Sequence, residues 1–292
     1  MAWCYAPEVS EGADSVLRAM TDDGAFRVIT ARTTETVRGA IEAQAATGHT
    51  ARTFGELITG AILYRETMAP QLRVQGVLKG SSGTGSLVAD SHPSGRTRGL
   101  VQVKQGRELE LGRGAVIQMM RTLPSGRIAQ GLVELPSGGG ISQALMEYMQ
   151  TSEQVVSMVA VSTVMDASGE VAAGGYMVQL LPEVGRGPLM VMTERLRDFE
   201  SIDGRVGQAG FSPESLLEDL LHGMPFTRLE ESAVGFECWC DELRVVAAIA
   251  TLSKADLEHL LADGEVLEIA CEYCKREYRI PPARLRGLLE RS

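Results

Sequence analysis

The chain lacks a long hydrophobic run. Its longest apolar-rich stretch, residues 155–165, is interrupted by serines and a threonine and is too short to span a bilayer. The first twenty residues carry three acidic side chains and no apolar segment of the kind that a secretory signal contains. We therefore expect a cytoplasmic protein with no membrane partner.

The sequence also lacks a basic segment. Its 292 residues carry 28 Lys and Arg against 38 Asp and Glu, which gives a net charge of -10. Residues 1–182 have a net charge of -2, residues 183–234 of -5 and residues 235–292 of -3. Because affinity for nucleic acid depends on Lys and Arg that neutralise phosphates, this balance argues against a nucleic-acid partner.

Motifs for nucleotide binding and catalysis are missing as well. The glycine-rich residues 80–85 are not followed by the lysine that a phosphate-binding loop needs, so this stretch fits a connection between strands better. The four histidines lie in no recognisable catalytic context: His49, His92, His222 and His259. We therefore expect that the protein is not an enzyme.

The hydrophobic content of 44% supports a folded core, and its pattern is mixed. Apolar periodicity predicts a helix over residues 34–46 and a second helix from Thr53, with Glu56 at its capping-box position. Short segments bounded by turn residues predict strands, at residues 26–30, 72–78, 86–89, 99–103, 115–121 and 128–135. Three Pro-Ser-Gly sequences indicate hairpin turns, at residues 93–95, 124–126 and 136–138. These patterns predict an α+β fold whose N-terminal domain is an antiparallel sheet packed with helices.

The next segments continue the mixed pattern. Ser142 is expected to cap a helix that runs toward residue 152. Residues 155–164 fit either a helix or a strand. Residues 171–181 fit a buried strand, in which Gly174-Gly175 marks a bulge or a close backbone approach.

The composition changes at Pro182. A Gly/Pro/Arg-rich stretch and an acidic region lead to a helix over residues 212–222, which has a leucine face that must dock on another part of the protein. These changes predict three parts: an N-terminal domain (1–182), a partly helical linker (183–234) and a small C-terminal domain (235–292).

Cysteine is scarce and unevenly distributed. Four of the five cysteines form two short-spaced pairs, Cys238-Trp239-Cys240 and Cys271-Glu272-Tyr273-Cys274, here called the cysteine quartet. In a reducing cytosol, such pairs more often bind metal or carry redox chemistry than form structural disulfides. Two pairs at this spacing predict a Cys4 zinc site with one Zn²⁺. The fifth cysteine, Cys4, is expected to be a free thiol without a role.

The C-terminal domain is too small for a secure core. We expect a helix capped by Ser253 and a hairpin of residues 266–269 and 278–280 to bring the cysteine pairs together. Zinc would then supply much of the folding energy, on the order of 10 kcal/mol in small zinc modules. A purely structural zinc is the commoner role of a Cys4 site. A Cys-x-Cys pair, however, can close only a small, constrained disulfide ring, and strained disulfides tend to be labile and regulatory.

At these residues the sequence resembles a known family. The run from Phe236 to Cys240, the 30-residue spacer, and the second cysteine pair followed by Tyr278 resemble the zinc domain of the heat shock protein 33 family, the redox-regulated bacterial chaperones of the stress response. Three upstream sequences resemble landmarks of the same family, in the right order: Arg98-Gly99, Ser152-Glu153-Gln154 and the run from Gly174 to Pro182.

The resemblance implies a mechanism and a site. The N-terminal domain would bind substrate and form dimers, the linker would be metastable, and the C-terminal domain would be a redox switch. The reduced, zinc-bound form would be inactive. Oxidation would release zinc and form Cys238–Cys240 and Cys271–Cys274 disulfides, and the protein, as a homodimer, would bind unfolded client proteins and protect them from oxidative and heat aggregation. The alternative is a purely structural Cys4 zinc module in a protein with an unidentified enzymatic or binding function.

Overall fold

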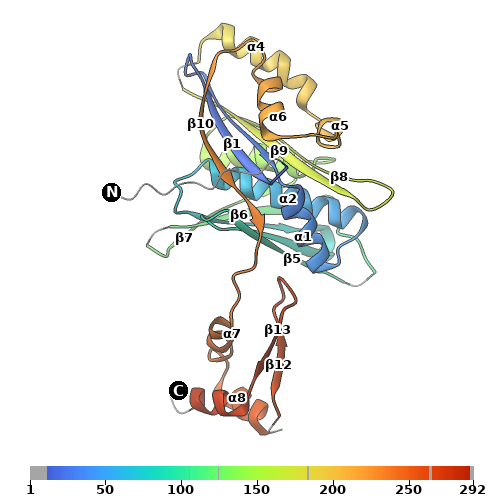
Figure 1. Ribbon diagram of the computed structural model, residues 1–292, viewed down its shortest axis with the longest axis vertical. Coiled ribbons are helices and arrows are strands. Elements are labelled where there is room, and N and C mark those ends of the chain that lie inside the picture. Colours follow the sequence, from blue (N-terminus) through green and yellow to red (C-terminus); the bar gives the residue numbers. More distant parts are fainter. Residues whose placement is uncertain (1–11, 105, 124, 183, 263–264, 290–292) are drawn as a thin grey trace. The chain divides into compact units, whose positions relative to one another are not determined.

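The computed structural model describes residues 12–104, 106–123, 125–182, 184–262 and 265–289 (Figure 1). The chain divides into two compact units, Met1–Phe236 and Glu237–Ser292. Cys4, expected to be a free thiol, lies outside the described residues.

The first unit contains a five-stranded antiparallel sheet in the order β10-β1-β2-β9-β8. Its strands are β1 (Ser15–Thr21), β2 (Phe26–Arg32), β8 (Ser157–Met165), β9 (Val171–Leu180) and β10 (Phe226–Ala233). The strands expected near residues 26–30 and 171–181 are confirmed. Residues 155–164, for which the sequence left helix and strand open, lie mainly in β8. The registers of β9 with β2 and β8 are continuous, so its two glycines mark no bulge. A Cβ at Gly174 would lie 2.5 Å from the ring of Phe211, and one at Gly175 would lie 2.7 Å from the carbonyl oxygen of Ala160, so both glycines mark a close approach.

The second sheet of this unit has six strands in the order β11-β5-β4-β3-β6-β7. They are β3 (Arg73–Lys79), β4 (Gly85–Ser91), β5 (Arg96–Val103), β6 (Val116–Thr122), β7 (Ile128–Glu134) and β11 (Gly235–Phe236). The short β11 pairs in parallel with β5, and the other neighbours are antiparallel. All five strands expected between residues 72 and 135 are confirmed.

The Pro-Ser-Gly turns have two different roles. The first two connect hairpins, β4 with β5 and β6 with β7. The third follows the edge strand β7, where no further strand can pair, and it leads into helix α3 (Ile141–Tyr148). The prediction of a third hairpin was therefore wrong. Ser142 lies inside α3 and not at its cap, which is Gly140, and a π-helical turn η2 (Met149–Glu153) continues the helix.

Helix α2 (Gly48–Glu66) lies between the two sheets and follows α1 (Thr34–Gln44) (Figure 1). Its apolar side chains are fully buried, which makes it the centre of the core. It begins five residues before the expected start at Thr53, and Glu56 is not a cap. Instead, Oε2 of Glu108, from the connection between β5 and β6, accepts a hydrogen bond from the backbone N–H of Thr50 at 2.6 Å. A residue that is distant in sequence thus accepts a hydrogen bond from an N–H group in the first turn of α2, which has no partner within the helix.

Residues 184–226 cover the outer face of the five-stranded sheet. They form α4 (Arg186–Leu196), a 3-10 turn η3 (Arg197–Phe199), α5 (Asp203–Val206) and α6 (Pro213–Leu220). The two faces of the five-stranded sheet pack against different elements. On β1, Val16 belongs to the core around α2, whereas its neighbour Leu17 packs with the leucines of α6. The leucines of α6 and of its C-cap are at most 1% exposed: Leu216, Leu217, Leu220 and the C-cap Leu221. The expected docking of this helix is confirmed, and Ser212 caps it by accepting a hydrogen bond from the N–H of Ser215 at 3.1 Å.

The second unit is small. It contains α7 (Glu242–Ile249), α8 (Lys254–Ala262), a hairpin of β12 (Leu267–Ala270) and β13 (Glu277–Ile280), and α9 (Pro282–Leu289). The expected hairpin and the helix capped by Ser253 are confirmed. Helix α7 was not predicted, although Asp241 caps it by accepting from the N–H of Arg244 at 2.8 Å. The expected α+β class is also confirmed. None of the described helices is both long and apolar enough to cross a membrane.

Candidate metal centre

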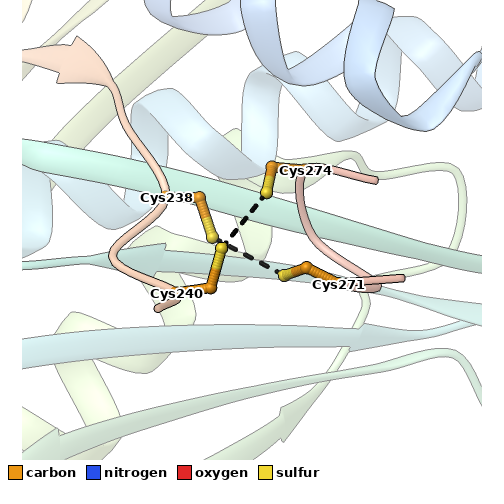
Figure 2. A group of neighbouring side chains, drawn as sticks. All are labelled: Cys238, Cys240, Cys271 and Cys274. Carbon is orange, nitrogen blue, oxygen red and sulfur yellow. Dashed lines mark hydrogen bonds between the residues drawn. The ribbon is translucent and has the colours of Figure 1, made fainter. Parts of the chain in front are cut away.

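The cysteine quartet forms one cluster in the second unit (Figure 2). Cys238 and Cys240 lie just before α7, and Cys271 and Cys274 lie in the turn between β12 and β13. All four Sγ atoms lie within 4.8 Å of one another, and each side chain is half-buried. The structure therefore brings together all four cysteines that the sequence singled out.

The distances in the quartet fit a tetrahedral metal site. Sγ of Cys238 lies 3.8 Å from Sγ of Cys271, and Sγ of Cys240 lies 3.4 Å from Sγ of Cys274 (Figure 2). A tetrahedron with metal–sulfur bonds of about 2.3 Å has sulfur–sulfur edges of about 3.8 Å. A disulfide would need about 2.05 Å, so none of the four residues forms a disulfide. Four sulfur ligands in this arrangement could hold one metal ion and suit Zn²⁺.

Backbone hydrogen bonds shape the turn that carries the second pair. The N–H of Cys271 donates to the carbonyl oxygen of Arg276 at 2.9 Å, and the N–H of Lys275 donates to the carbonyl oxygen of Cys271 at 2.8 Å. Lys275 has a φ of 59°, in the left-handed region, which lets the chain reverse after Cys274. The turn is thus closed by its own backbone, and both thiols lie toward the first pair (Figure 2).

Two thiols of the quartet have different pKa values because their surroundings differ. Burial raises the pKa of Cys240, but hydrogen bonds from the Tyr278 hydroxyl and from the other thiols outweigh it and lower the pKa to about 7. Burial and the hydrogen bond to Cys240 raise the pKa of Cys274 to about 12. Cys240 is therefore the first of these two thiols to become a thiolate, the form that binds metal and attacks oxidants.

Sequence reasoning missed one contact of the quartet. Oη of Tyr278 donates a hydrogen bond to Sγ of Cys240 at 3.1 Å. The sequence marked Tyr278 only as part of a family resemblance. A signal was present, because Tyr278 and Ile280 alternate along β13 and so lie on the same face, which packs on the small core of this unit.

The landmark Ser152-Glu153-Gln154 has a structural role in the first unit. Glu153 accepts hydrogen bonds from the hydroxyls of Tyr64 at 2.6 Å and Tyr148 at 3.2 Å, and it pairs with Arg121 at 2.8 Å. This network joins α2, α3 and β6, and it fixes the end of the π-helical turn before β8.

Comparison with known proteins agrees with this architecture. The family model described as Hsp33 protein matches residues 14–281. The 33 kDa chaperonin of Syntrophotalea carbinolica is 28% identical over 287 residues, which cover 94% of this chain and 99% of the relative. The 33 kDa chaperonin of Listeria monocytogenes (serovar 1/2a) is 27% identical over 294 residues, which cover 96% and 99%.

A solved structure shows the same fold. The crystal structure of the 33 kDa chaperonin (heat shock protein 33 homolog) from Thermotoga maritima matches with a TM-score of 0.81 and 23% sequence identity, over 95% of this chain and 98% of that one. The family model spans most of the described residues, including the whole cysteine quartet. The resemblance found in the motifs is confirmed, and the chain belongs to the Hsp33 family of chaperones.

Proposed function

We propose that this chain is a redox-regulated holdase, which binds unfolding proteins after oxidation has released Zn²⁺ from the cysteine quartet. The observation that carries the proposal is the close approach of four thiols in a unit with almost no core. Three apolar side chains are fully buried in the described part of this unit: Ile249, Leu257 and Ile280. So small a core cannot support a stable fold alone, and a bound metal would supply the missing stability.

The quartet would act as both metal site and redox site. One Zn²⁺ held by all four thiolates would supply folding energy on the order of 10 kcal/mol. When the two thiolates of a pair give two electrons to hypochlorous acid, a sulfur–sulfur bond forms, and the oxidant leaves as chloride and hydroxide. The metal then loses its ligands, and the unit loses most of its stability.

The proposed disulfides are Cys238–Cys240 and Cys271–Cys274. The short distances of 3.8 and 3.4 Å join one thiol of each pair across the folded unit. Those contacts depend on the fold, whereas the two members of a pair stay near each other in the unfolded chain. Because this proximity survives the loss of the fold, oxidation that accompanies unfolding favours disulfides within each pair.

We assign the other parts of the chain to client binding and its control. In this proposal, residues 1–182 bind substrate and form the homodimer, residues 183–234 are a metastable linker, and residues 235–292 are the switch. The linker buries an apolar sheet face, contributed by Leu17, Ala19, Phe26, Val28, Tyr176 and Val178. Release of the linker would expose this face together with its own leucines, and large exposed apolar surfaces bind other proteins.

Unfolding of the proposed switch can spread to the proposed linker along the chain. Strand β10 ends the linker, and the next strand, β11, ends at Phe236, two residues before Cys238. β10 is an edge strand that pairs with β1 and exposes most of its side chains. An edge strand with little buried surface opens at low free-energy cost. Loss of order after Phe236 would therefore reach the linker through β10.

The test follows three quantities in one oxidation time course. Reduced, zinc-loaded protein is treated with hypochlorite, or with peroxide at elevated temperature, and zinc release, free thiols and suppression of client aggregation are measured in parallel. The proposal predicts the loss of one zinc and four thiols, coincident with the gain of activity. Activity that is already complete before zinc leaves, or absent after verified zinc release, would refute it.

A further inference from the structure

Tyr278 lies beside the cysteine quartet without belonging to it. Its ring packs against the small core of the second unit, and its hydroxyl reaches Sγ of Cys240 at 3.1 Å. Residue 278 is paired with Ile269 across the hairpin, so the backbone of both strands fixes its position. The hydroxyl is thus held at the sulfur by packing on one side and by strand pairing on the other.

A hydroxyl donor at a thiolate has a known chemical effect. A charge-assisted hydrogen bond stabilises the anionic sulfur and withdraws electron density from it. In zinc-loaded protein Cys240 would be a thiolate with or without this bond, so the bond would not change the amount of thiolate. It would only make the thiolate a weaker nucleophile, because nucleophilicity falls as the basicity of the sulfur falls. The same bond orients the sulfur, since the acceptor must lie along the direction of the O–H group.

We propose that Tyr278 is a positioning residue for the switch: its hydrogen bond to Sγ of Cys240 holds this thiolate in the reduced site and slows its attack on oxidants. Tyr278 thereby sets how much oxidant is needed to open the quartet. This inference rests on the proposed redox function for its biological meaning, but the hydrogen bond and its effect on Cys240 can be measured without a client protein.

The test uses the full-length, reduced protein and the variant Tyr278→Phe. Phenylalanine keeps the ring in the small core and removes the hydroxyl, which donates to Cys240 and also hydrogen-bonds with the side chain of Arg276. Tyr273→Phe is the matched control, because it removes a hydroxyl from the turn that carries Cys271 and Cys274. Each protein is loaded with Zn²⁺ and treated with iodoacetamide, and the alkylation rate of each cysteine is followed by peptide mass spectrometry.

The expected result is specific to one sulfur. Thiolate nucleophilicity rises with the basicity of the sulfur, so loss of the hydrogen-bond donor should raise the alkylation rate severalfold. Alkylation of Cys240 should accelerate by this factor in Tyr278→Phe, while the other three cysteines keep the wild-type rate. In Tyr273→Phe, Cys240 should keep the wild-type rate. A wild-type rate at Cys240 in Tyr278→Phe would overturn the proposal. An equal acceleration of all four cysteines would also overturn it, because that result shows a merely structural role.

A spectroscopic measurement gives an independent readout. In Co²⁺-loaded protein, the sulfur-to-cobalt charge-transfer bands should move to lower energy in Tyr278→Phe, because a thiolate without its donor gives electrons more readily. Unchanged bands would contradict the proposal. If these readouts change but the oxidised protein does not suppress aggregation, the proposed chaperone function fails and the role of Tyr278 stands.

Discussion

The ring of Phe236 packs directly on the backbone of Gly39 in helix α1. A Cβ atom at position 39 would lie 2.8 Å from Cδ1 of the ring, a distance that real Cβ contacts do not show. Phe236 is the last residue of the first unit and stands two residues before Cys238. The glycine therefore makes room for the aromatic side chain that anchors the chain just before the first cysteine pair in the sequence.

The substitution Gly39→Ala should weaken this anchor. Overpacking costs about 1–3 kcal/mol, against a gain in helix propensity of about 1 kcal/mol, so the net loss of stability is up to about 2 kcal/mol. We expect the variant to become active at a lower dose of hypochlorite than the wild type, measured as the dose for half-maximal suppression of client aggregation. Gly187→Ala is the control, because a Cβ at that helical glycine meets no atom within 4 Å. An unchanged dose in Gly39→Ala would show that Phe236 is not an anchor.

The substitution Leu217→Ala should loosen the linker itself. Leu217 is 0% exposed among the apolar residues of α6 and the five-stranded sheet, and its truncation should cost about 2–5 kcal/mol. We expect faster hydrogen exchange over residues 184–221 and partial chaperone activity of the reduced, zinc-loaded protein. Leu229→Ala on β10 is the control, since Leu229 is 51% exposed. A reduced Leu217→Ala protein with faster exchange but no activity would contradict the assignment of the linker as the cover of the binding surface.

Glu56 should make the first unit less stable at neutral pH. Burial, followed by the charge of Asp203 on α5, raises the pKa of Glu56 from 4.5 to about 7. Because the folded-state pKa lies above the unfolded value, the favourable contribution is present below pH 4.5 and is lost as the pH rises to about 7. The shift corresponds to at most about 3.4 kcal/mol.

Urea denaturation of Glu56→Gln tests this pH dependence. The variant should be more stable than the wild type at pH 7.5 and nearly equal to it at pH 5. Glu42→Gln, at an exposed position of α1, should follow the wild type at both values. If Glu56→Gln differs from the wild type in stability by the same amount at both pH values, the carboxyl does not titrate in this range.

Removal of the metal should unfold the second unit and leave the core of the first unit folded. The first unit has an extensive core around α2, whereas the second has three buried apolar side chains in its described part. A chelator added to reduced protein should abolish hydrogen-exchange protection in α7, α8 and the β12–β13 hairpin, and should leave α2 protected. Retained protection of the hairpin in metal-free, reduced protein would mean that the metal does not stabilise this unit.

Local signals predicted much of this fold. The strands β3 to β7 follow from short apolar segments between turn residues, and the cysteine quartet follows from spacing alone. Features that depend on distant partners were missed. The start of α2 depends on Glu108, far along the chain, and the contact from Tyr278 to Cys240 depends on how the hairpin folds. Strand β10 was also missed, because its exposed, charged sequence becomes a strand only through pairing with β1.

The partner of the leucine face of α6 was not predictable for the same reason. Its periodicity showed that it must dock, but the acceptor face is built from β1, β2, β8 and β9, which come together only in the folded sheet. A one-dimensional pattern identifies an unpaired apolar face, and the tertiary fold decides what covers it.

The central claim is that the cysteine quartet controls client binding. A single preparation of the protein should be assayed for suppression of the aggregation of a thermally unfolding client in three successive states: reduced with zinc, oxidised, and reduced again with zinc restored. We predict little suppression in the first state, strong suppression in the second and little in the third. Equal suppression in the reduced and oxidised states would contradict the claim.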